Sequence, residues 1–300
     1  MGNLEQLAVD PFFPDNFLTA PLDKESRTQG VVWPKISIVM PSFNQVDYIE
    51  RSILSIINQG YPDVELIVID GGSSDGTVDI IKRYKEFITY WISEEDNGQS
   101  DALNKGFSLA TGEILGWLNS DDLYLPSAFF RAVDAFSGNP SASIVFGDWL
   151  SIDENDKLID LNHAFNFSLS HFKYEGFHLN AQSMFWKQDV HRRFSGFDVD
   201  LYNTMDYQMI LEFGCNEGAR SFVRIPSALG AFRRYQGQKT GGVNTRAELE
   251  HRQLAERYDY SDKYTAAGYF KRFIYRWRRI VWYVRRGGIQ GLVHRLRLAA

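Results

Sequence analysis

Short apolar runs alternate with amphipathic segments over residues 36–118, and this alternation is the feature that most limits how the chain can fold. The runs are typical of buried strands and lie at residues 36–40, 66–69, 88–92 and 114–118. The segments between them place apolar residues at helical spacing. Strands that alternate with single helices form a largely parallel sheet with right-handed crossovers. The sequence therefore predicts an α/β fold with a mixed, mainly parallel sheet flanked by helices.

Three polar segments come directly after predicted strands. They are residues 41–44, 70–75 and 119–122. The carboxyl ends of parallel strands meet at one edge of a sheet, and ligands of such proteins bind beyond that edge. We therefore expect the three segments to converge on one binding site.

The acidic pair Asp121–Asp122 ends the apolar run 114–118. Two carboxylates at the end of a buried strand are costly without a nearby cation, and Mg²⁺ takes one or two carboxylates while leaving positions for phosphates. Neighbouring residues of an extended chain point to opposite sides, so the pair is badly placed to act as the facing carboxyl groups of a glycosidase. Asn-Ser-Asp-Asp also favours turns, so these residues alone leave a metal site and a capped loop as alternatives.

The second half of the chain has a more mixed pattern. Short strands are predicted at residues 144–149, 155–161, 183–186, 222–225 and 228–232. A helix begins at Met205 with Asp206 in its first turn, where the helix dipole alone would favour an acid. Further on, Arg233, Arg234 and Lys239 lie in a glycine-containing loop that suits phosphate binding or, alternatively, forms a solvated basic loop.

The charge of the chain is divided unevenly. The net charge is −6, but the ten charged residues from Lys263 onward are all basic, so the remainder carries −6 minus 10, or −16. Such a split indicates that one end meets an anionic surface. The acidic remainder and the lack of a recognition motif argue against nucleic acid as that partner.

The basic C-terminal segment also predicts an amphipathic helix. Its apolar stripe comprises Phe270, Phe273, Ile274, Trp277, Val281 and Val284. A break is expected at Gly287–Gly288. Basic and aromatic residues without acids favour an interfacial helix that places residues 268–300 on an anionic membrane. The alternatives are a helix docked on the preceding α/β part of the chain and a homodimer interface.

These patterns divide the chain into three parts. Residues 1–34 are expected to form an irregular N-terminal arm, residues 35–240 the α/β domain, and residues 241–300 a helical basic extension. The single cysteine, Cys215, excludes an internal disulfide and suits a reducing compartment. No signal peptide is evident and no run reaches the ~18 apolar residues of a spanning helix. We therefore expect a cytoplasmic protein that is peripheral on the inner face of a membrane.

Residues 35–240 resemble the family 2 glycosyltransferases of the GT-A fold. The resemblance rests on an ordered set of motifs at residues 36–44, 66–77, 96–106, 110–122, 196–198, 205–207 and 232–240. It implies an inverting transferase of hexosyltransferase type, which moves a sugar from a nucleoside diphosphate sugar, with a UDP-sugar favoured, to an acceptor hydroxyl. The acceptor is expected to be a glycan or a lipid-linked molecule in the assembly of a cell-surface polysaccharide or glycolipid.

The resemblance also implies roles for individual residues on the nucleotide side of the site. The matching positions are Pro41, Ser42 and Asn44 beside the nucleotide, Asp70 near the base and ribose, and Asp101, Asn104 and Lys105 approaching the donor.

Further roles are implied on the reaction side. Asp122, with Asp121, matches the acidic motif that binds Mn²⁺ or Mg²⁺, and Asp121 also contributes to donor binding. Asp206 matches the catalytic base, and Arg233 and Lys239 match a basic loop near the diphosphate.

Two positions depart from the family pattern. Many relatives carry a second acid after Asp70, where this chain has Gly71, and many carry a histidine where Tyr235 or Gln236 stands. These departures leave a non-catalytic nucleotide-sugar-binding or scaffold protein as an alternative. A nucleotidyltransferase is less well supported, because its first loop is usually basic and rich in glycine, unlike residues 41–44.

Overall fold

The computed structural model describes residues 33–176, 179–239, 245–260 and 265–298, with side chains described up to residue 281 and at Val284. The arm predicted at residues 1–34 therefore lies outside the described residues, except for its last two.

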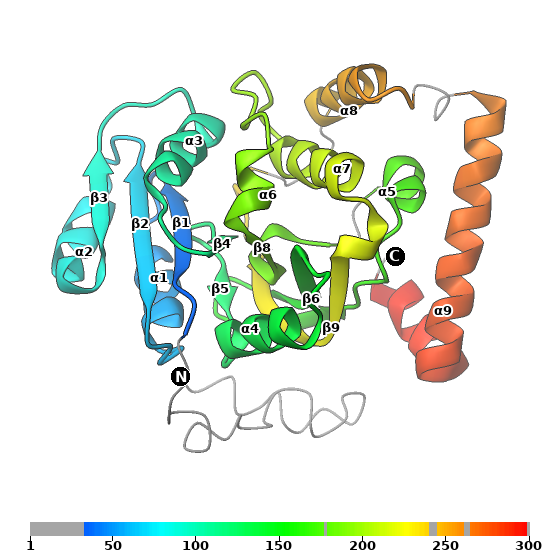
Figure 1. The fold of residues 1–300 in the computed structure, drawn as a ribbon, viewed down its shortest axis with the longest axis horizontal. Helices are drawn as coiled ribbons and strands as arrows, with labels where there is room; N and C mark the ends of the chain where they lie inside the picture. The colour runs from blue at the N-terminus through cyan, green and yellow to red at the C-terminus, as the bar shows by residue number, and fades with distance from the viewer. Residues whose placement is uncertain (1–32, 177–178, 240–244, 261–264, 299–300) are drawn as a thin grey trace.

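One mixed sheet runs through the molecule (Figure 1). Its strands are β1 Ile36–Ser42, β2 Val64–Asp70, β3 Tyr90–Ser93, β4 Ile114–Trp117, β5 Leu123–Tyr124, β6 Ile144–Ile152, β7 Leu158–Asn162, β8 Met184–Lys187 and β9 Phe222–Arg233. Their order is β3-β2-β1-β4-β8-β6-β9-β5, and β7 pairs with β6. Strands β3, β2, β1 and β4 run parallel, as do β6 and β9, whereas β8 is antiparallel to both of its neighbours. The predicted mixed, mainly parallel α/β sheet is confirmed.

Helices flank this sheet on both sides (Figure 1). They are α1 Ile49–Ile57, α2 Thr77–Arg83, α3 Gln99–Leu109, α4 Ala128–Gly138, α5 Leu169–Glu175, α6 Gln188–Arg192, α7 Met205–Glu217, α8 Thr245–Arg257 and α9 Ala266–Leu298. The helix expected from Met205 is confirmed and extends to Glu217. The two short strands predicted at 222–225 and 228–232 are one strand, β9, and its register with β6 shifts near Pro226, which has no N–H to donate.

Strand β1 shows why the sheet is covered on both faces. Ile38 and Met40 belong to a buried cluster with α1, α2 and α4, whereas Val39 belongs to a second cluster with α3 and α7. Successive side chains of a strand point to opposite faces, so a strand that is apolar at every position must be packed on both. This buried centre fixes the strand ends that carry the polar segments.

The hydrophobic core continues past residue 240, where the sequence predicts the end of the α/β domain. Leu254 and Ala255 of α8 are fully buried in the same cluster as Met209 and Ile210 of α7. Helix α8 is therefore packed into the core beside α7.

Helix α9 differs from its prediction in one respect. The break expected at Gly287–Gly288 is absent, because a single helix spans Ala266–Leu298. Glycine costs a helix about 1 kcal/mol relative to alanine, and the long helix accommodates this locally unfavourable pair. Among the described residues, no helix is both long enough and apolar enough to cross a membrane.

We expect Gly106→Ala to destabilise the fold. A Cβ at Gly106 would lie 2.3 Å from a methyl group of Val39, so α3 could not keep its distance from β1. Overpacking of this kind costs about 1–3 kcal/mol, measurable as a lower free energy of unfolding in urea. Gly138→Ala in α4 is the matched control, since a Cβ there meets nothing within 4 Å. Equal stabilities of the two variants would contradict this packing argument.

Candidate active site

The segments that follow β1 and β2 are joined by backbone and side-chain hydrogen bonds. The N–H of Gly71 donates to the carbonyl of Ser42 over 2.9 Å. Asn44, in the left-handed region at φ 50°, donates its N–H to Ser73 Oγ over 2.7 Å and accepts from the N–H of Ser74 over 3.0 Å. Asn adopts this backbone region more readily than most residues. The predicted convergence of the first two polar segments is therefore present.

Asp70 holds these segments to β3. Its carboxylate is fully buried and accepts hydrogen bonds from the N–H and hydroxyl of Ser73 and from the hydroxyl of Ser93. These bonds compensate the burial of the charge. At the end of β1, which includes Pro41, the buried hydroxyl of Ser42 has no hydrogen-bond partner in the described part of the chain. Ser42 thus keeps a free polar atom at the edge of the sheet.

The carboxylate of Asp96 lies against Gly71, the position at which many relatives carry a second acid. A Cβ built on Gly71 would lie 3.0 Å from Asp96 Oδ2, so the carboxylate covers the glycine. Its Oδ1 accepts from the N–H of Gly98 over 2.8 Å, and burial raises the pKa of Asp96. The sequence analysis missed this residue because Asp96 and Gly71 are far apart in the chain and meet only when β2 and β3 pair.

Helix α3 carries the three donor-side residues named from the resemblance. Asp101 accepts from the N–H of Asn97, which lowers its pKa, and pairs with Lys105 at 3.4 Å. Lys105 also contacts Glu94 at 3.2 Å and remains partly exposed. Asn104 instead exchanges two hydrogen bonds with the backbone of Phe197, at 2.7 and 2.8 Å. Asn104 therefore fixes the turn at residues 196–198, while Asp101 and Lys105 form an ion pair at the rim.

The acidic pair lies at the end of β4. Asp122 is fully buried; its Oδ1 accepts from the N–H of Arg233 and its Oδ2 from the amide of Asn119, at 3.0 and 3.1 Å. Asp121 is less buried, and its Oδ2 accepts from the hydroxyl of Tyr235 at 2.9 Å. Burial raises the pKa of both carboxyl groups, and the charge of Asp121 raises that of Asp122 further. The pair is thus short of positive charge.

The side chain of Arg233 is fully buried behind this pair. Its guanidinium donates to the carbonyls of Asp121 and Asp153 and forms an ion pair with Asp156. It also lies over the ring of Tyr48, 4.9 Å from the ring centre. The resemblance puts Arg233 near a diphosphate, but in this structure its charge is directed at protein acceptors, so it supports the acidic loop from behind.

Tyr235 stands where many relatives have a histidine. Its hydroxyl donates to Asp121 and accepts from the amide of Gln45 at 3.2 Å, and its ring packs on Tyr48 at 4.7 Å. A phenol in this position hydrogen-bonds to a carboxylate without adding positive charge. Tyr235 therefore adds no positive charge to the acidic pair, and the nearby charge of Arg233 offsets part of the pair's negative charge.

Asp206 lies in the first turn of α7, as predicted. Burial raises its pKa to about 6, and the nearby charge of Lys239 opposes that rise. Burial likewise lowers the pKa of Lys239 to about 8, while Asp206 acts to raise it. The ammonium group of Lys239 lies 4.1 Å from the ring centre of Tyr202. A carboxylate with a pKa near neutrality is well suited to exchange a proton.

A line of hydrogen bonds joins the two parts of the site. Lys239 donates to Gln99 at 3.1 Å, Gln99 donates to Asn119 at 2.7 Å, and Asn119 donates to Asp122. The oxygen of Asn119 also accepts from the indole of Trp117. The sequence analysis identified the ends of this line but not Gln99 or Asn119. Asn119 lies beside the acidic pair in the sequence, which is the one signal that could have identified it.

The acidic pair fits a hard divalent cation only if a ligand completes the coordination. Among the described residues there is no group of three or more His, Cys, Asp or Glu side chains that could hold a metal ion alone. Asp121 and Asp122 nevertheless supply carboxylate oxygens, which Mg²⁺ and Mn²⁺ prefer, and these ions commonly take further oxygens from phosphates.

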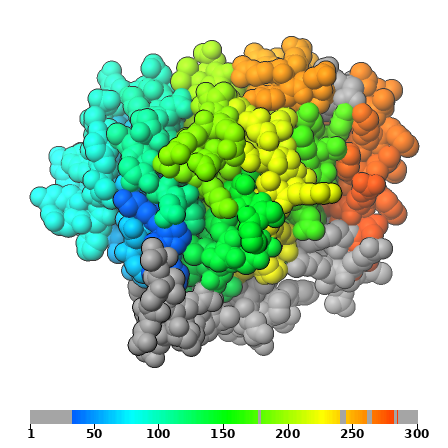
Figure 2. Space-filling view, viewed as in Figure 1, coloured from blue at the N-terminus to red at the C-terminus, as the bar shows by residue number. Residues whose placement is uncertain are grey.

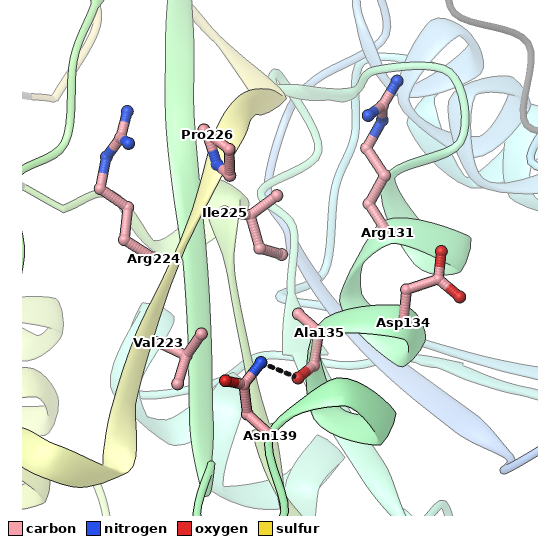
Figure 3. A pocket seen from close by; sticks show the side chains of 8 residues that line it. All are labelled: Arg131, Asp134, Ala135, Asn139, Val223, Arg224, Ile225 and Pro226. Carbon is pink, nitrogen blue, oxygen red and sulfur yellow. Dashed lines mark hydrogen bonds between the residues drawn. The ribbon is translucent and has the colours of Figure 1, made fainter.

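A separate surface pocket lies between α4 and β9 (Figure 3). It has a volume of about 320 Å³ and is lined by Arg131, Asp134, Ala135, Asn139, Val223, Arg224, Ile225 and Pro226. Pro226 is seven residues from Arg233 along β9, or about 23 Å in an extended strand. This pocket is therefore not part of the acidic site.

Comparison with known proteins agrees with this arrangement. The model of the family "Glycosyl transferase family 2" matches residues 37–205. An uncharacterized glycosyltransferase of Mycobacterium tuberculosis is 32% identical over 183 residues, which cover 59% of this chain and 68% of the relative. The putative teichuronic acid biosynthesis glycosyltransferase TuaG of Bacillus subtilis is 39% identical over 92 residues, or 30% of this chain and 36% of TuaG.

Two solved structures share the fold. TarS of S. aureus in complex with UDP-GlcNAc matches with a TM-score of 0.61 and 15% identity, over 77% of this chain and 67% of TarS. A mannosyltransferase of Pyrobaculum calidifontis in complex with GDP-Man and Mn²⁺ matches with a TM-score of 0.54 and 16% identity, over 90% and 80% of the two chains. Since the family model covers more than half of the sequence, the chain belongs to glycosyltransferase family 2.

Proposed function

We propose that this glycosyltransferase moves a hexosyl group from a nucleoside diphosphate sugar to an acceptor hydroxyl, with inversion at the anomeric carbon. The observation that carries the proposal is the line of hydrogen bonds from Lys239 through Gln99 and Asn119 to Asp122. Asp206, whose pKa is raised, interacts with the charge of Lys239 at one end of this line, and the acidic pair lies at the other end, which supports a single site.

Each part of the site has a defined task in this proposal. Asp206 accepts the proton of the acceptor hydroxyl as that oxygen attacks the anomeric carbon. Asp121 and Asp122 would hold Mn²⁺ or Mg²⁺, which supplies positive charge to the leaving diphosphate. Lys239 adds a further positive charge beside the departing phosphate.

The sheet order suggests where the nucleoside lies. Strand β2 is two positions from β4, and β3 is three positions away, or about 10–14 Å at the spacing of neighbouring strands. A nucleotide whose diphosphate meets Asp121 and Asp122 would extend across β1 and bring its base to Asp96. An ionised carboxylate only accepts hydrogen bonds. It therefore favours uracil or guanine, which carry a ring N–H, and we favour a UDP-sugar.

The relatives support a role in polysaccharide assembly. TuaG is described as a putative teichuronic acid biosynthesis enzyme, and TarS was solved with UDP-GlcNAc. We therefore propose a glycan or lipid-linked acceptor of the cell surface. Turnover of donor would exclude the two alternatives, a non-catalytic binding or scaffold protein and a nucleotidyltransferase that releases diphosphate.

Replacing the base should stop the chemistry without preventing donor binding. We expect Asp206→Asn to lower kcat by about 10²–10⁴, with little change in the affinity for donor measured by calorimetry. Because the base must be ionised and its pKa is about 6, kcat/KM of the wild type should fall as the pH drops through about 6. Transfer by Asp206→Asn at the wild-type rate would refute the role of Asp206.

The acidic pair should make nucleotide binding depend on metal. We expect wild-type protein to bind UDP more tightly with Mn²⁺ than without it in calorimetric titrations, and Asp122→Asn to lose this difference. Asp79→Asn is the control, since the Asp79 side chain is 82% exposed. It lies on α2, which follows β2, and β1 separates β2 from β4, the strand that leads to the acidic pair. A full Mn²⁺ effect in Asp122→Asn would show that the metal binds elsewhere.

Asp96 should set the preference for the base. A hydrogen bond to a charged group contributes about 1.5–3 kcal/mol, so wild-type protein should bind UDP about ten- to a hundredfold more tightly than CDP. In Asp96→Asn the amide can donate to the ring nitrogen of cytosine, and this preference should shrink or reverse. The exposed neighbour Glu95, changed to Gln, is the control. An unchanged UDP-to-CDP ratio in Asp96→Asn would contradict the assignment.

A further inference from the structure

One face of α9 is docked on the catalytic domain. Lys271 Nζ donates to the hydroxyl of Tyr174 at 2.9 Å, and Arg279 forms an ion pair with Glu175 at 2.9 Å. Between them, the ring of Tyr275 stacks on His171, with 5.1 Å between ring centres. The spacing i, i+4 and i+8 of Lys271, Tyr275 and Arg279 places all three on the same side of the helix.

The anchoring ion pair is buried on one side only, since the side chain of Arg279 is 39% exposed. Glu175 is only 5% exposed at its side chain. Burial alone would raise its pKa, but the hydrogen bond from His171 and the charge of Arg279 hold the pKa below its usual value. A buried charge that loses its partner is strongly destabilising. This contact therefore fixes the rotation of α9 about its own axis.

The opposite face of α9 points outward. Phe270, Phe273 and Trp277 are 65%, 65% and 59% exposed, and Tyr269 beside them is 61% exposed. The spacing i, i+3 and i+7 of the first three residues defines one stripe, roughly half a turn away from Lys271, Tyr275 and Arg279 at 100° per residue. Figure 2 shows α9 in orange at the outer surface of the molecule.

The apolar stripe was thus predicted correctly, but the helix docks through its other side. Docking on the catalytic domain, one of the three interpretations that the sequence left open, is therefore observed, and it leaves an outward apolar face that a membrane or a second copy of the chain could cover. Large exposed aromatic patches on a water-soluble surface mark interaction sites.

The positive charge near this face favours an anionic partner over a second copy of the same face. Arg272 lies over the ring of Tyr269, 5.9 Å from the ring centre, Arg276 is exposed on the flank of the stripe, and the chain contains no acidic residue after Asp262. Two copies of this face would bring basic side chains together, which is unfavourable. A surface of anionic lipid offers opposite charge to the arginines and an apolar boundary for the aromatic rings.

We propose that the outward face of α9, formed by Tyr269, Phe270, Phe273 and Trp277, is a docking surface for anionic lipid. The aromatic rings enter the boundary between headgroups and acyl chains, and Arg272 and Arg276 contact the negative headgroups. The docked face holds the catalytic domain at a fixed orientation to the lipid. This inference depends on neither the donor nor the transfer reaction.

The test is cosedimentation of the full-length protein with vesicles. We expect binding to vesicles that contain phosphatidylglycerol, weak binding to phosphatidylcholine alone, and loss of binding as salt is raised. Burying one aromatic side chain contributes about 1.5–3 kcal/mol, so each of Phe273→Ser and Trp277→Ser should weaken binding about tenfold or more. Phe87→Ser is the matched control, since Phe87 is an equally exposed aromatic residue, 60%, on the far end of the sheet.

Thermal unfolding, UDP binding and sedimentation velocity serve as controls for the fold, the donor site and the oligomeric state of the variants. Thermal unfolding and Mn²⁺-dependent binding of UDP should be unchanged in Phe273→Ser and Trp277→Ser, because their side chains make no contact with the donor site. Unchanged vesicle binding in both variants would overturn the proposal, as would equal binding to both kinds of vesicle. A concentration-dependent dimer that disappears in Trp277→Ser, seen by sedimentation velocity, would also overturn it in favour of contact between two copies.

Discussion

The burial of one guanidinium organises the reaction side of the molecule. Arg233 at the end of β9 is fully buried and gathers the carbonyl of Asp121 after β4, the carbonyl of Asp153 after β6, and the carboxylate of Asp156. A buried charge is costly unless it is paired and hydrogen-bonded; Nε and Nη1 of Arg233 have such partners, while Nη2 has none among the described residues. The ends of three strands are therefore held together by the acceptors that one cation requires.

This arrangement has a consequence for the acidic pair. The backbone N–H of Arg233, and not its guanidinium, donates to Asp122, because the guanidinium is directed at acceptors behind the loop. The guanidinium thus offsets the charge of the pair only in part, and burial keeps the pKa of both carboxyl groups raised. If Arg233 instead paired with both carboxylates, the loop would be stable but would have little affinity for a metal. In this arrangement Arg233 stabilises the loop, whereas the carboxylates of Asp121 and Asp122 are the groups proposed to bind a cation.

The sequence predicted what depends on local pattern. Strands β1, β2 and β4 and the start of α7 were found from apolar periodicity, and the polar segments after the strands were placed at one edge by the rule for parallel sheets. The family relationship was reached through motifs that are ordered along the chain, and the match over residues 37–205 confirms it.

What the sequence did not predict depends on contacts between distant segments. Asp96 meets Gly71 only through the pairing of β2 with β3, and Gln99 joins Lys239 across 140 positions. The outward direction of the α9 stripe was equally hidden, because periodicity defines a face but not what covers it. In α9, Lys271 and Arg279 contact Tyr174 and Glu175 of α5. The aromatic side chains of the stripe are exposed instead.

The segment beyond residue 240 also supports the start of α7, where Asp206, the proposed base, lies. Glu250 of α8 is buried and accepts from the N–H groups of Tyr202 and Asn203 and from the hydroxyl of Thr204, the residues that lead into α7. These bonds fix the entry to the helix whose second residue is Asp206. From the other side, α5 reaches α7 through the stacked rings of Phe172 and Tyr207, and α9 is docked on α5. Helix α9 is therefore connected to the start of α7 through packed rings and the ion pair of Arg279 with Glu175. If Asp206 is the base and the outward face of α9 docks on lipid, as proposed, this connection would give an acceptor at the lipid surface a fixed orientation to Asp206.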